Sequence, residues 1–466
     1  MKIGLEIHVQ LTTKTKLFCG CSNKFTEMPN VHVCDYCIGF PGSKPRLNRK
    51  AVEYAAKIGL ALNCRFSHEM AMSRKSYFYP DMGKNFQITQ YEMPIALEGH
   101  LTAGKKKIRI TRIQIEEDPA RLQHMADGEP ATITTAKYVL VDYGRSGTPL
   151  CEIVTEPDFT SPQEAKQFLQ NLSVILEYLS VYDPEQEGSM RIDANISLGS
   201  SRVEVKNISG FKDVERALNY EIVRQKGVMK RKQKVKRETR GWDAGAGVTR
   251  SQRSKEEEEE YGYIFEPDLP VTRIKKSELD ELKKTMPEFA HEKIERYTKD
   301  FGVPEEIAVA LTIEPDFAAM FESVAARMDK QLAARWFSGP IRKTLNYNNM
   351  RMRQSKLTAE NIIKLLKCVK EKILTDRSAE LLLREMVVKG TDIDILLASQ
   401  RTERIEDESM LNHVVKEVLN ENPKAIIDYK SGKQETFHFL VGQIIRRTRG
   451  RADVEVVRKL LRRQIG

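Results

Sequence analysis

The feature that most constrains this chain is a strict alternation of apolar and polar residues close to its first residue. Over residues 3–11 every second residue is apolar, and Glu6, His8 and Gln10 stand between the apolar ones. This two-residue period is typical of a β-strand with one buried face. Side chains two positions apart on a strand share a face at about 6–7 Å. Glu6 and His8 can therefore reach one cation, although the segment alone also fits a solvent-facing strand.

The same alternation recurs in residues 112–117, 149–154, 190–198 and 203–208. The polar positions carry both signs of charge, on Arg112, Glu116, Glu152, Arg191, Asp193, Glu204 and Lys206. Glu117 falls on the apolar side unless its strand ends there. Glu152 stands inside an apolar run, where an unpaired charge costs several kcal/mol, so it needs a metal or an Arg as partner. We predict a sheet whose polar face forms the floor of a catalytic cleft, with a solvated sheet as the alternative.

The polar face has the ligands of a hard metal ion. Carboxylates with one imidazole suit Mg²⁺ or Mn²⁺, and Mg²⁺ commonly accompanies phosphate. Arg and Lys side chains supply complementary contacts to phosphate oxygens. Residues 99–105 imitate the start of a P-loop, but Lys106 replaces the Ser or Thr that would ligate magnesium, and a hairpin is expected there. Without a dinucleotide-binding glycine motif, any nucleotide must be held by the sheet itself, as in glutamine-synthetase-like folds.

Three domains are predicted from the pattern along the 466 residues. Residues 1–286 are α+β, with a mainly antiparallel sheet and a helix at residues 163–178. From residue 287 to 405 apolar residues recur at three and four, which indicates a helical domain. Residues 406–466 form a small helical tail domain. Residues 256–260 are an acidic run, expected to be a helix start or an exposed loop.

Four of the seven cysteines lie between residues 19 and 37. Cys19 and Cys21 form one close pair, and Cys34 and Cys37 form another. This spacing predicts a structural zinc site with four thiolates and no open coordination position, which orders the loop at the rim of the cleft. Four reduced thiols are the alternative. The remaining cysteines are expected to be buried thiols.

The formal net charge is +10, from 76 Lys and Arg against 66 Asp and Glu. Residues 226–255 carry eleven Lys or Arg, and residues 446–463 carry eight. Such clusters favour a polyanionic partner such as nucleic acid, and solvated surfaces are the alternative. No stretch reaches the length of a membrane span and no signal peptide is visible, so a cytoplasmic location is expected.

Long motifs then resemble one known family, the B subunits of heterotrimeric GatCAB aminoacyl-tRNA amidotransferases. In the first 300 residues these are Ile3-Gly-Leu-Glu-Ile-His-Val-Gln-Leu11, Tyr77-Phe-Tyr-Pro-Asp81, Gln87-Ile-Thr-Gln-Tyr91, Ile115-Glu-Glu-Asp118, Val141-Asp-Tyr-Gly-Arg-Ser-Gly-Thr-Pro149, Met190-Arg-Ile-Asp-Ala-Asn195, Glu204-Val-Lys-Asn207, Gln252-Arg-Ser-Lys-Glu256 and Glu266-Pro-Asp-Leu-Pro270. The tail motifs, at residues 425–433 and 439–443, resemble that family's YqeY-like domain.

The resemblance implies an ATP-dependent ligase that corrects tRNA misacylated with Asp or Glu. The side-chain carboxylate is phosphorylated by ATP and then attacked by ammonia, which a glutaminase (A) subunit supplies in a complex with a small C subunit. The implied catalytic residues are Glu6, His8, Glu116, Glu117 and Glu152. Four of these, Glu6, His8, Glu117 and Glu152, are the implied magnesium ligands. Contacts to ATP or to the aminoacyl end are implied for Lys75, Tyr79, Asp81, Arg191, Asp193 and Lys206. A non-catalytic, zinc-stabilised RNA-binding scaffold is the alternative function.

Overall fold

A computed structural model describes residues 1–104, 106–131, 135–186, 188–199, 201–254, 261–400, 405, 408–448 and 450–465. The chain divides into two compact units, Met1–Phe289 and Ala290–Gly466. The second unit contains two separate hydrophobic cores, one around Trp336 and one around Leu440. The division into three domains stays a prediction. The acidic run at residues 256–260 lies outside the described residues.

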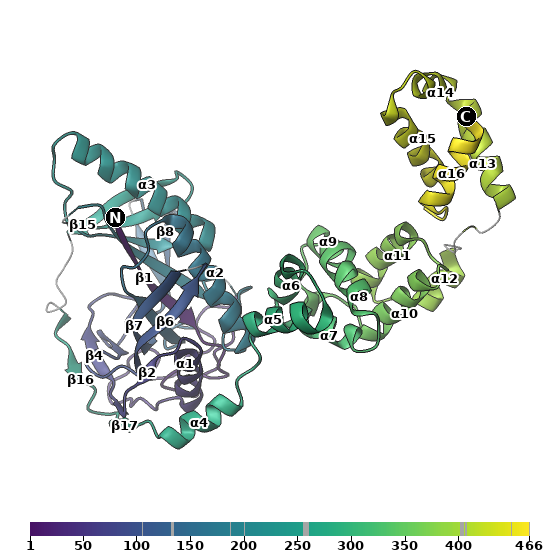
Figure 1. The fold of residues 1–466 in the computed structure, drawn as a ribbon. Coiled ribbons are helices and arrows are strands. Elements are labelled where there is room, and N and C mark those ends of the chain that lie inside the picture. The colour runs from purple at the N-terminus through teal and green to yellow at the C-terminus, as the bar shows by residue number, and fades with distance from the viewer. Residues whose placement is uncertain are drawn as a thin grey trace. The chain divides into compact units, whose positions relative to one another are not determined.

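A nine-stranded sheet forms the centre of the first unit (Figure 1). Its strands, in spatial order, are β15 (Val248–Ser254), β14 (Glu238–Asp243), β13 (Val203–Ile208), β12 (Met190–Ser197), β1 (Lys2–Gln10), β11 (Pro149–Thr155), β7 (Lys106–Glu117), β6 (Ala96–Ala103) and β2 (Arg65–Phe66). All neighbours are antiparallel except β13 and β14, which are parallel. The predicted α+β class and the five predicted strands are confirmed. The described residues of the stretch 99–105, which are 99–104, belong to the hairpin of β6 and β7, as expected, and not to a phosphate loop.

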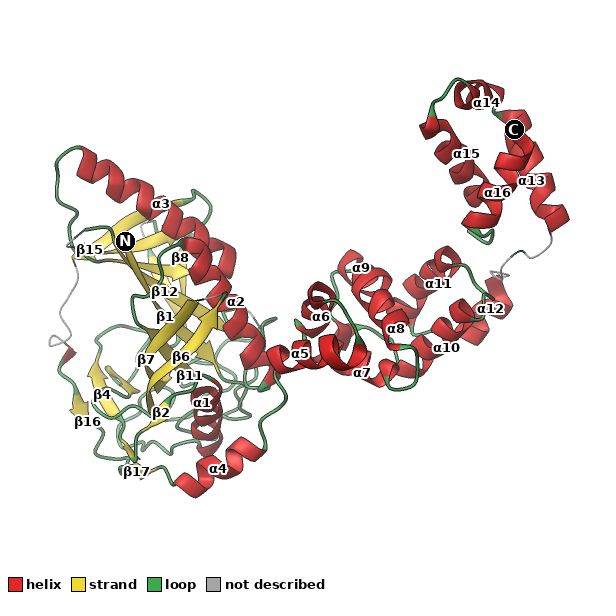
Figure 2. Ribbon diagram, in the orientation of Figure 1, coloured by secondary structure: helices red, strands yellow, loops and turns green. Residues whose placement is uncertain are grey.

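Helices cover the apolar face of this sheet (Figure 2). They are α1 (Arg49–Ala61), α2 (Pro162–Tyr178) and α3 (Phe211–Lys230). Helix α2 begins where Ser161 accepts a hydrogen bond from the Glu164 amide and Pro162 occupies the first turn, two strong start signals. Its apolar side packs with Ile3, Leu5 and Ile7 of β1 in one core. Because side chains alternate along each strand, the polar residues are left on the opposite face.

Smaller elements surround the central sheet. One sheet contains β16 (Ile264–Phe265), β4 (Ser73–Ser76) and β5 (Phe86–Thr89); a second contains β10 (Tyr138–Asp142), β8 (Arg121–Ala126) and β9 (Glu129–Pro130); a third pairs β17 (Thr272–Arg273) with β3 (Glu69–Met70). Helix α4 (Lys276–Lys284) is the last helix of this unit.

The second unit is helical, as predicted. Its helices are α5 (Ala290–Phe301), α6 (Glu305–Thr312), α7 (Pro315–Ala325), α8 (Lys330–Trp336), α9 (Arg342–Tyr347), α10 (Ala359–Lys370), α11 (Asp376–Lys389), α12 (Ile393–Gln400), α13 (Glu408–Glu421), α14 (Pro423–Lys430), α15 (Gln434–Arg447) and α16 (Val454–Ile465), with a π-helix at Phe337–Ile341 and a 3₁₀ turn at Met352–Gln354. Among the described residues no helix has the length and apolar character to cross a membrane.

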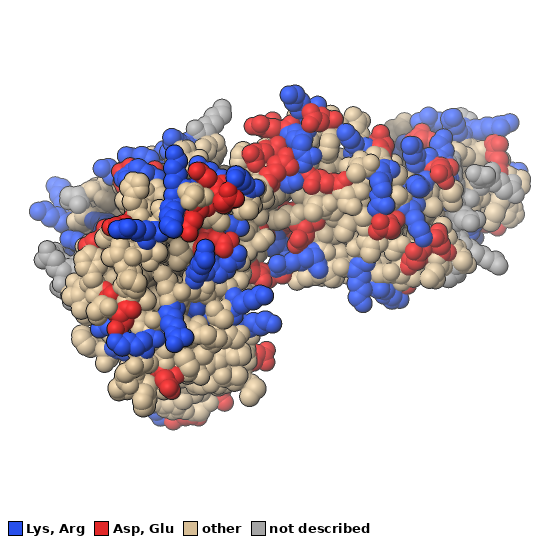
Figure 3. Space-filling view, turned by 90° about the horizontal axis from the view of Figure 1, so that it is seen from below, with Lys and Arg blue, Asp and Glu red and all other residues tan. Residues whose placement is uncertain are grey.

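On the face drawn in Figure 3, Lys and Arg side chains lie among Asp and Glu over the surface.

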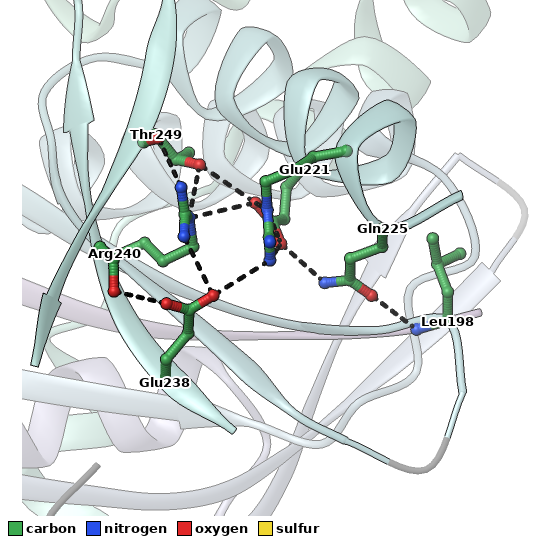
Figure 4. A network of polar contacts seen from close by, with 8 residues as sticks. Leu198, Glu221, Gln225, Glu238, Arg240 and Thr249 are labelled. Atoms are coloured by element: carbon green, nitrogen blue, oxygen red, sulfur yellow. Dashed lines mark hydrogen bonds and ion pairs between the residues drawn. The ribbon is translucent and has the colours of Figure 1, made fainter. Parts of the chain in front are cut away.

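A buried polar network fixes α3 to strands β14 and β15 (Figure 4). The carboxylate of Glu221 is fully buried and accepts hydrogen bonds from Arg224, Gln225 and Thr249. Arg240 of β14 lies 3.7 Å from Glu221 and donates to Thr249 of β15. A buried ionic network of this kind is costly to break on one side only, because the remaining charges stay desolvated.

We predict that Glu221→Ala lowers the free energy of unfolding of the first unit by about 3–5 kcal/mol, because it leaves Arg224 and Arg240 partly buried without their carboxylate. Asp213→Ala is the matched control on the same helix, since its pair with Arg216 is more exposed, and it should cost about 1 kcal/mol or less. Urea unfolding of both variants measures the difference. Equal losses would contradict the anchoring role of Glu221.

Candidate active site

The register of the central strands collects the predicted polar residues on one face. His8 lies opposite Glu152 on β11 and opposite Arg191 on β12. Glu6 lies opposite Asp193 on β12, and Asn195 lies opposite Glu204 on β13. Residues from distant parts of the chain thereby become neighbours. They form two groups of acidic side chains, which we call the first and second acidic clusters.

The first acidic cluster contains His8, Glu116 and Glu152, whose ligand atoms lie within 4.8 Å of one another. His8 Nε2 is 3.3 Å from Glu116 Oε1 and 3.9 Å from Glu152 Oε1. Both carboxylates are buried, and Gln114 donates a hydrogen bond to Glu152. Burial raises the pKa of Glu152; the Glu116 carboxylate raises it further, and His8 lowers it. The cluster would therefore be stabilised by additional positive charge.

The second acidic cluster contains Glu6, Asp193 and Glu204, also within 4.8 Å. Burial raises the pKa of Glu6, and the charge of Glu152 adds to this effect. Lys206 donates to Asp193 at 2.8 Å and lies 3.5 Å from Glu204. Burial would lower the pKa of Lys206, but the two carboxylates more than offset it, so the lysine pKa is raised. One lysine faces three carboxylates, which leaves the cluster with an excess of negative charge.

The donor atoms of both clusters fit divalent cations. In the second cluster, Asn195 donates its amide to Glu6 at 2.8 Å, while its buried Oδ1 has no hydrogen-bond partner. A buried acceptor of this kind needs a donor or a cation. Carboxylate and amide oxygens with one imidazole are the ligands of Mg²⁺ and Mn²⁺. His8, Glu116 and Glu152 could hold one ion, and Glu6, Asp193, Glu204 and Asn195 could hold another.

Glu117 lies apart from both clusters. Its carboxylate is 1% exposed, is 2.6 Å from Lys84 Nζ, and accepts hydrogen bonds from Tyr36 and from the Ile88 amide. Lys84 already neutralises this carboxylate. The structure thus brings Glu116, and not Glu117, to His8 and Glu152.

The remaining predicted site residues differ in their contacts and in their exposure to solvent. Arg191 donates to Asp118 at 2.7 Å, and this carboxylate raises the pKa of the arginine. The Lys75 ammonium lies 4.6 Å from the centre of the Tyr261 ring, and its charge lowers the pKa of Glu152. Tyr79 is 48% exposed.

Asp81 is buried, one of its oxygens has no hydrogen-bond partner, and burial raises its pKa. None of the candidate residues lines the hollow of about 840 Å³ beside α4, which is bordered by Arg65, His68 and Arg273.

Three participants in this arrangement were not predicted as site residues. Glu204 and Asn195 stand at polar positions of alternating segments, and the strand period had already placed Glu204 on the polar face without giving it a role. Thr239 donates to Glu204 at 2.9 Å from the neighbouring strand β14. No sequence pattern indicates Thr239, because its contact depends on the parallel pairing of β13 with β14.

The four predicted zinc ligands converge. Cys19, Cys21, Cys34 and Cys37 have sulfur atoms within 4.8 Å of one another, with Cys37 Sγ 3.7 Å from Cys19 Sγ and 3.8 Å from Cys34 Sγ. Four sulfurs at about 2.3 Å from a tetrahedral zinc ion are about 3.8 Å apart. A hydrogen bond from Cys19 and the nearby Lys16 ammonium lower the pKa of Cys37 to about 4. The cysteine cluster therefore fits a structural zinc ion.

Lys16 connects the cysteine cluster to the sheet. The buried ammonium donates to Cys37 Sγ at 3.3 Å, to the His32 carbonyl at 2.7 Å and to the Tyr143 carbonyl at 3.1 Å. Arg145, two residues after Tyr143 in the chain, lies 3.5 Å from Asp118. Asp118 is also the ion-pair partner of Arg191. The loop that carries the cysteines is thus joined to a residue beside the acidic clusters.

We predict that the purified protein contains about one zinc ion per chain and that Cys34→Ser removes most of it, because three thiolates hold the ion less tightly. Cys368→Ser, which lies outside the cluster, should keep the metal. Elemental analysis after dialysis measures both. Metal-free wild-type protein, or full zinc content in Cys34→Ser, would show that the four thiols have no structural metal.

Two family models match the chain. Residues 1–280 match the model described as the GatB/GatE catalytic domain, and residues 319–465 match the one described as the GatB domain. Curated relatives that are named as B subunits of aspartyl/glutamyl-tRNA(Asn/Gln) amidotransferases match over nearly the full length. The relative from Methanoregula boonei is 44% identical over 98% of this chain and 97% of its own length. The relative from Thermotoga maritima is 41% identical over 99% and 98%.

The predicted resemblance is confirmed by these matches, which include both the strands of the acidic clusters and the helical tail. A family model that covers the whole central sheet, with relatives above 40% identity over the full chain, leaves no large segment unaccounted for. This chain belongs to the GatB family.

Proposed function

We propose that this chain is the subunit of a tRNA-dependent amidotransferase that amidates the side-chain carboxylate of Asp or Glu on misacylated tRNA. The observation that carries the proposal is the convergence of two acidic clusters on one sheet face of a GatB-family chain. ATP and the misacylated tRNA are the substrates. A glutaminase (A) subunit supplies ammonia, a small C subunit completes the complex, and the complex acts in the cytoplasm.

The chemistry requires a leaving group on a carboxylate, which is a poor electrophile. A side-chain oxygen of the aminoacyl group attacks the terminal phosphorus of ATP, an O–P bond forms, and ADP leaves. Ammonia then attacks the carbonyl carbon and phosphate leaves. The two acidic clusters would hold divalent ions, which would supply positive charge to phosphate oxygens.

The cationic and the acidic side chains of the site have different roles in this reaction. The cationic side chains Arg191, Lys206 and Lys75 contact phosphate oxygens, and the first two are oriented by Asp118 and Asp193. The buried surroundings of Glu116 and Glu152 reduce competition from water. The Lys- and Arg-rich residues 446–463 contact the tRNA backbone.

A non-catalytic RNA-binding scaffold is the weaker candidate. It gives no use to the buried carboxylates, which repel one another when ionised and cost folding free energy. Buried groups with raised pKa values and too few partners are typical of functional sites.

We predict that Glu116→Ala, Glu152→Ala and Glu6→Ala each lower the amidation rate of the reconstituted complex by at least about 100-fold, because each removes a carboxylate from a cluster. Binding of tRNA and hydrolysis of glutamine by the partner should continue. The assay supplies misacylated tRNA, ATP and glutamine and measures amidated tRNA. Glu53→Gln, at a partly exposed helix position, is the control. Wild-type rates in Glu6→Ala would support the scaffold function instead.

We also predict that Mn²⁺ binds more tightly as pH rises from about 5 to about 8, in the range above the ordinary carboxylate pKa. The pKa values of Glu6 and Glu152 are raised, so their protonated forms are favoured by folding. Binding must displace these protons, so affinity increases in the same window. Calorimetric titration measures it.

The double variant Glu6→Gln/Glu152→Gln should bind Mn²⁺ more weakly than wild type, because each cluster has lost one carboxylate ligand. The same variant should be more stable than wild type in metal-free neutral buffer, because it no longer has to bury these two charges. Pairing the two readouts separates loss of ligands from unfolding. A wild-type affinity that does not vary with pH would contradict the raised pKa values.

A further inference from the structure

A run of positive charge lies where α3 ends and the chain returns to the sheet. Residues 226–237, which we call the basic segment, contain seven Lys or Arg and no Asp or Glu. All seven are exposed. Besides Arg237 they are Lys226, Lys230, Arg231, Lys232, Lys234 and Lys236.

The six cations of the basic segment that precede Arg237 have no acidic partner within the described part of the chain. Nearer the middle of α3, Arg216 pairs with Asp213 and Arg224 pairs with Glu221. The last turn of a helix favours positive charge, but only the first cations benefit from it. An anion bound from outside would relieve the remaining repulsion.

The basic segment is held on a rigid support. Glu221 and Gln225, in the turns just before it, belong to the buried network that ties α3 to β14 and β15 (Figure 4). The Leu198 amide also donates to Gln225. Helix α3 has 20 residues, about 30 Å, whereas β13 beneath it is about 20 Å long. The end of α3 therefore projects past the strands, as Figure 1 shows.

The basic segment leads directly into the candidate active site. Arg237 precedes Glu238, which starts β14 opposite Val203 of β13. The next residue, Thr239, donates to Glu204 of the second acidic cluster. Because β13 and β14 are parallel, the chain enters β14 at the same sheet edge where β13 begins. A ligand on the basic segment thus borders the end of the sheet that carries Glu204.

We propose that the basic segment binds the phosphate backbone of the RNA whose aminoacyl end enters the candidate active site. This inference rests on the proposed function and adds an RNA-binding surface in the first unit to those expected in the helical and tail domains. The segment contains no aromatic residue on which bases could stack, and five of its seven cations are lysines, which favours contact to phosphates.

Other polyanions fit the basic segment less well. A membrane-surface helix needs a free apolar face, but Val214, Ala217 and Leu218 of α3 are buried against the sheet. Protein interfaces are rich in aromatic residues and poor in Lys, the opposite of this segment. RNA is therefore the partner that its charge and composition indicate.

The test compares two triple variants in the assembled complex with full-length chains. Lys230→Gln/Arg231→Gln/Lys232→Gln removes three charges from the basic segment. Lys14→Gln/Lys24→Gln/Lys107→Gln removes the same number from exposed positions elsewhere in the first unit. The expected result is an increase of about tenfold or more in the Kd for misacylated tRNA near physiological salt, with a salt dependence reduced by about two to three ion equivalents. The control should keep the wild-type Kd, and kcat at saturating tRNA should be unchanged in both.

A Kd and salt dependence equal to those of the control would overturn the inference. It is equally overturned if the segment variant loses binding to polyglutamate or to phosphatidylserine vesicles but keeps wild-type affinity for tRNA, since the partner is then an acidic protein or a membrane. The binding measurement is independent of turnover. If the wild-type complex amidates no tRNA, the proposed function fails while the comparison of Kd values still decides whether the basic segment contacts RNA.

Discussion

The antiparallel register of β1 with its two neighbours is the constraint on which the site depends. It places His8 between Glu152 and Arg191, and it places Glu6 opposite Asp193. A shift of one residue would turn the whole polar set of β1 toward the apolar core and its apolar set toward the acidic residues. The apolar side chains of β1 are fully or almost fully buried. The same packing that stabilises the sheet therefore fixes which acidic groups meet.

That arrangement buries acidic side chains close together, which costs folding free energy but creates a site that can bind cations. Several carboxylates are buried close together with few cationic partners, and burial raises the pKa values of Glu6 and Glu152. Under the proposed function, divalent metal ions held by these carboxylates would supply the missing positive charge. Stability is recovered elsewhere, in the buried network around Glu221 and in the cysteine cluster that Lys16 joins to the Tyr143 loop. The site is thus the strained part of an otherwise well-satisfied unit.

The sequence predicted the parts of this structure that depend on local period. Alternation identified the five strands and the polar face, and cysteine spacing identified the group of four thiols. The distribution of side chains between two clusters could not be predicted, because it depends on the spatial order β13-β12-β1-β11-β7. The family resemblance implied Glu117 as the magnesium ligand, whereas the strand period placed its neighbour Glu116 on the polar face. Lys84, a residue without any distinguishing pattern, separates them by pairing with Glu117.

The most direct measurement is X-ray diffraction at the manganese absorption edge from crystals soaked in Mn²⁺. An anomalous peak is expected with a His8 ring nitrogen and oxygens of Glu116 and Glu152 each at about 2.0–2.2 Å. This peak should disappear in Glu152→Ala crystals. A fully ordered His8, Glu116 and Glu152 with no anomalous density between them, at a Mn²⁺ concentration that supports amidation, would contradict the account.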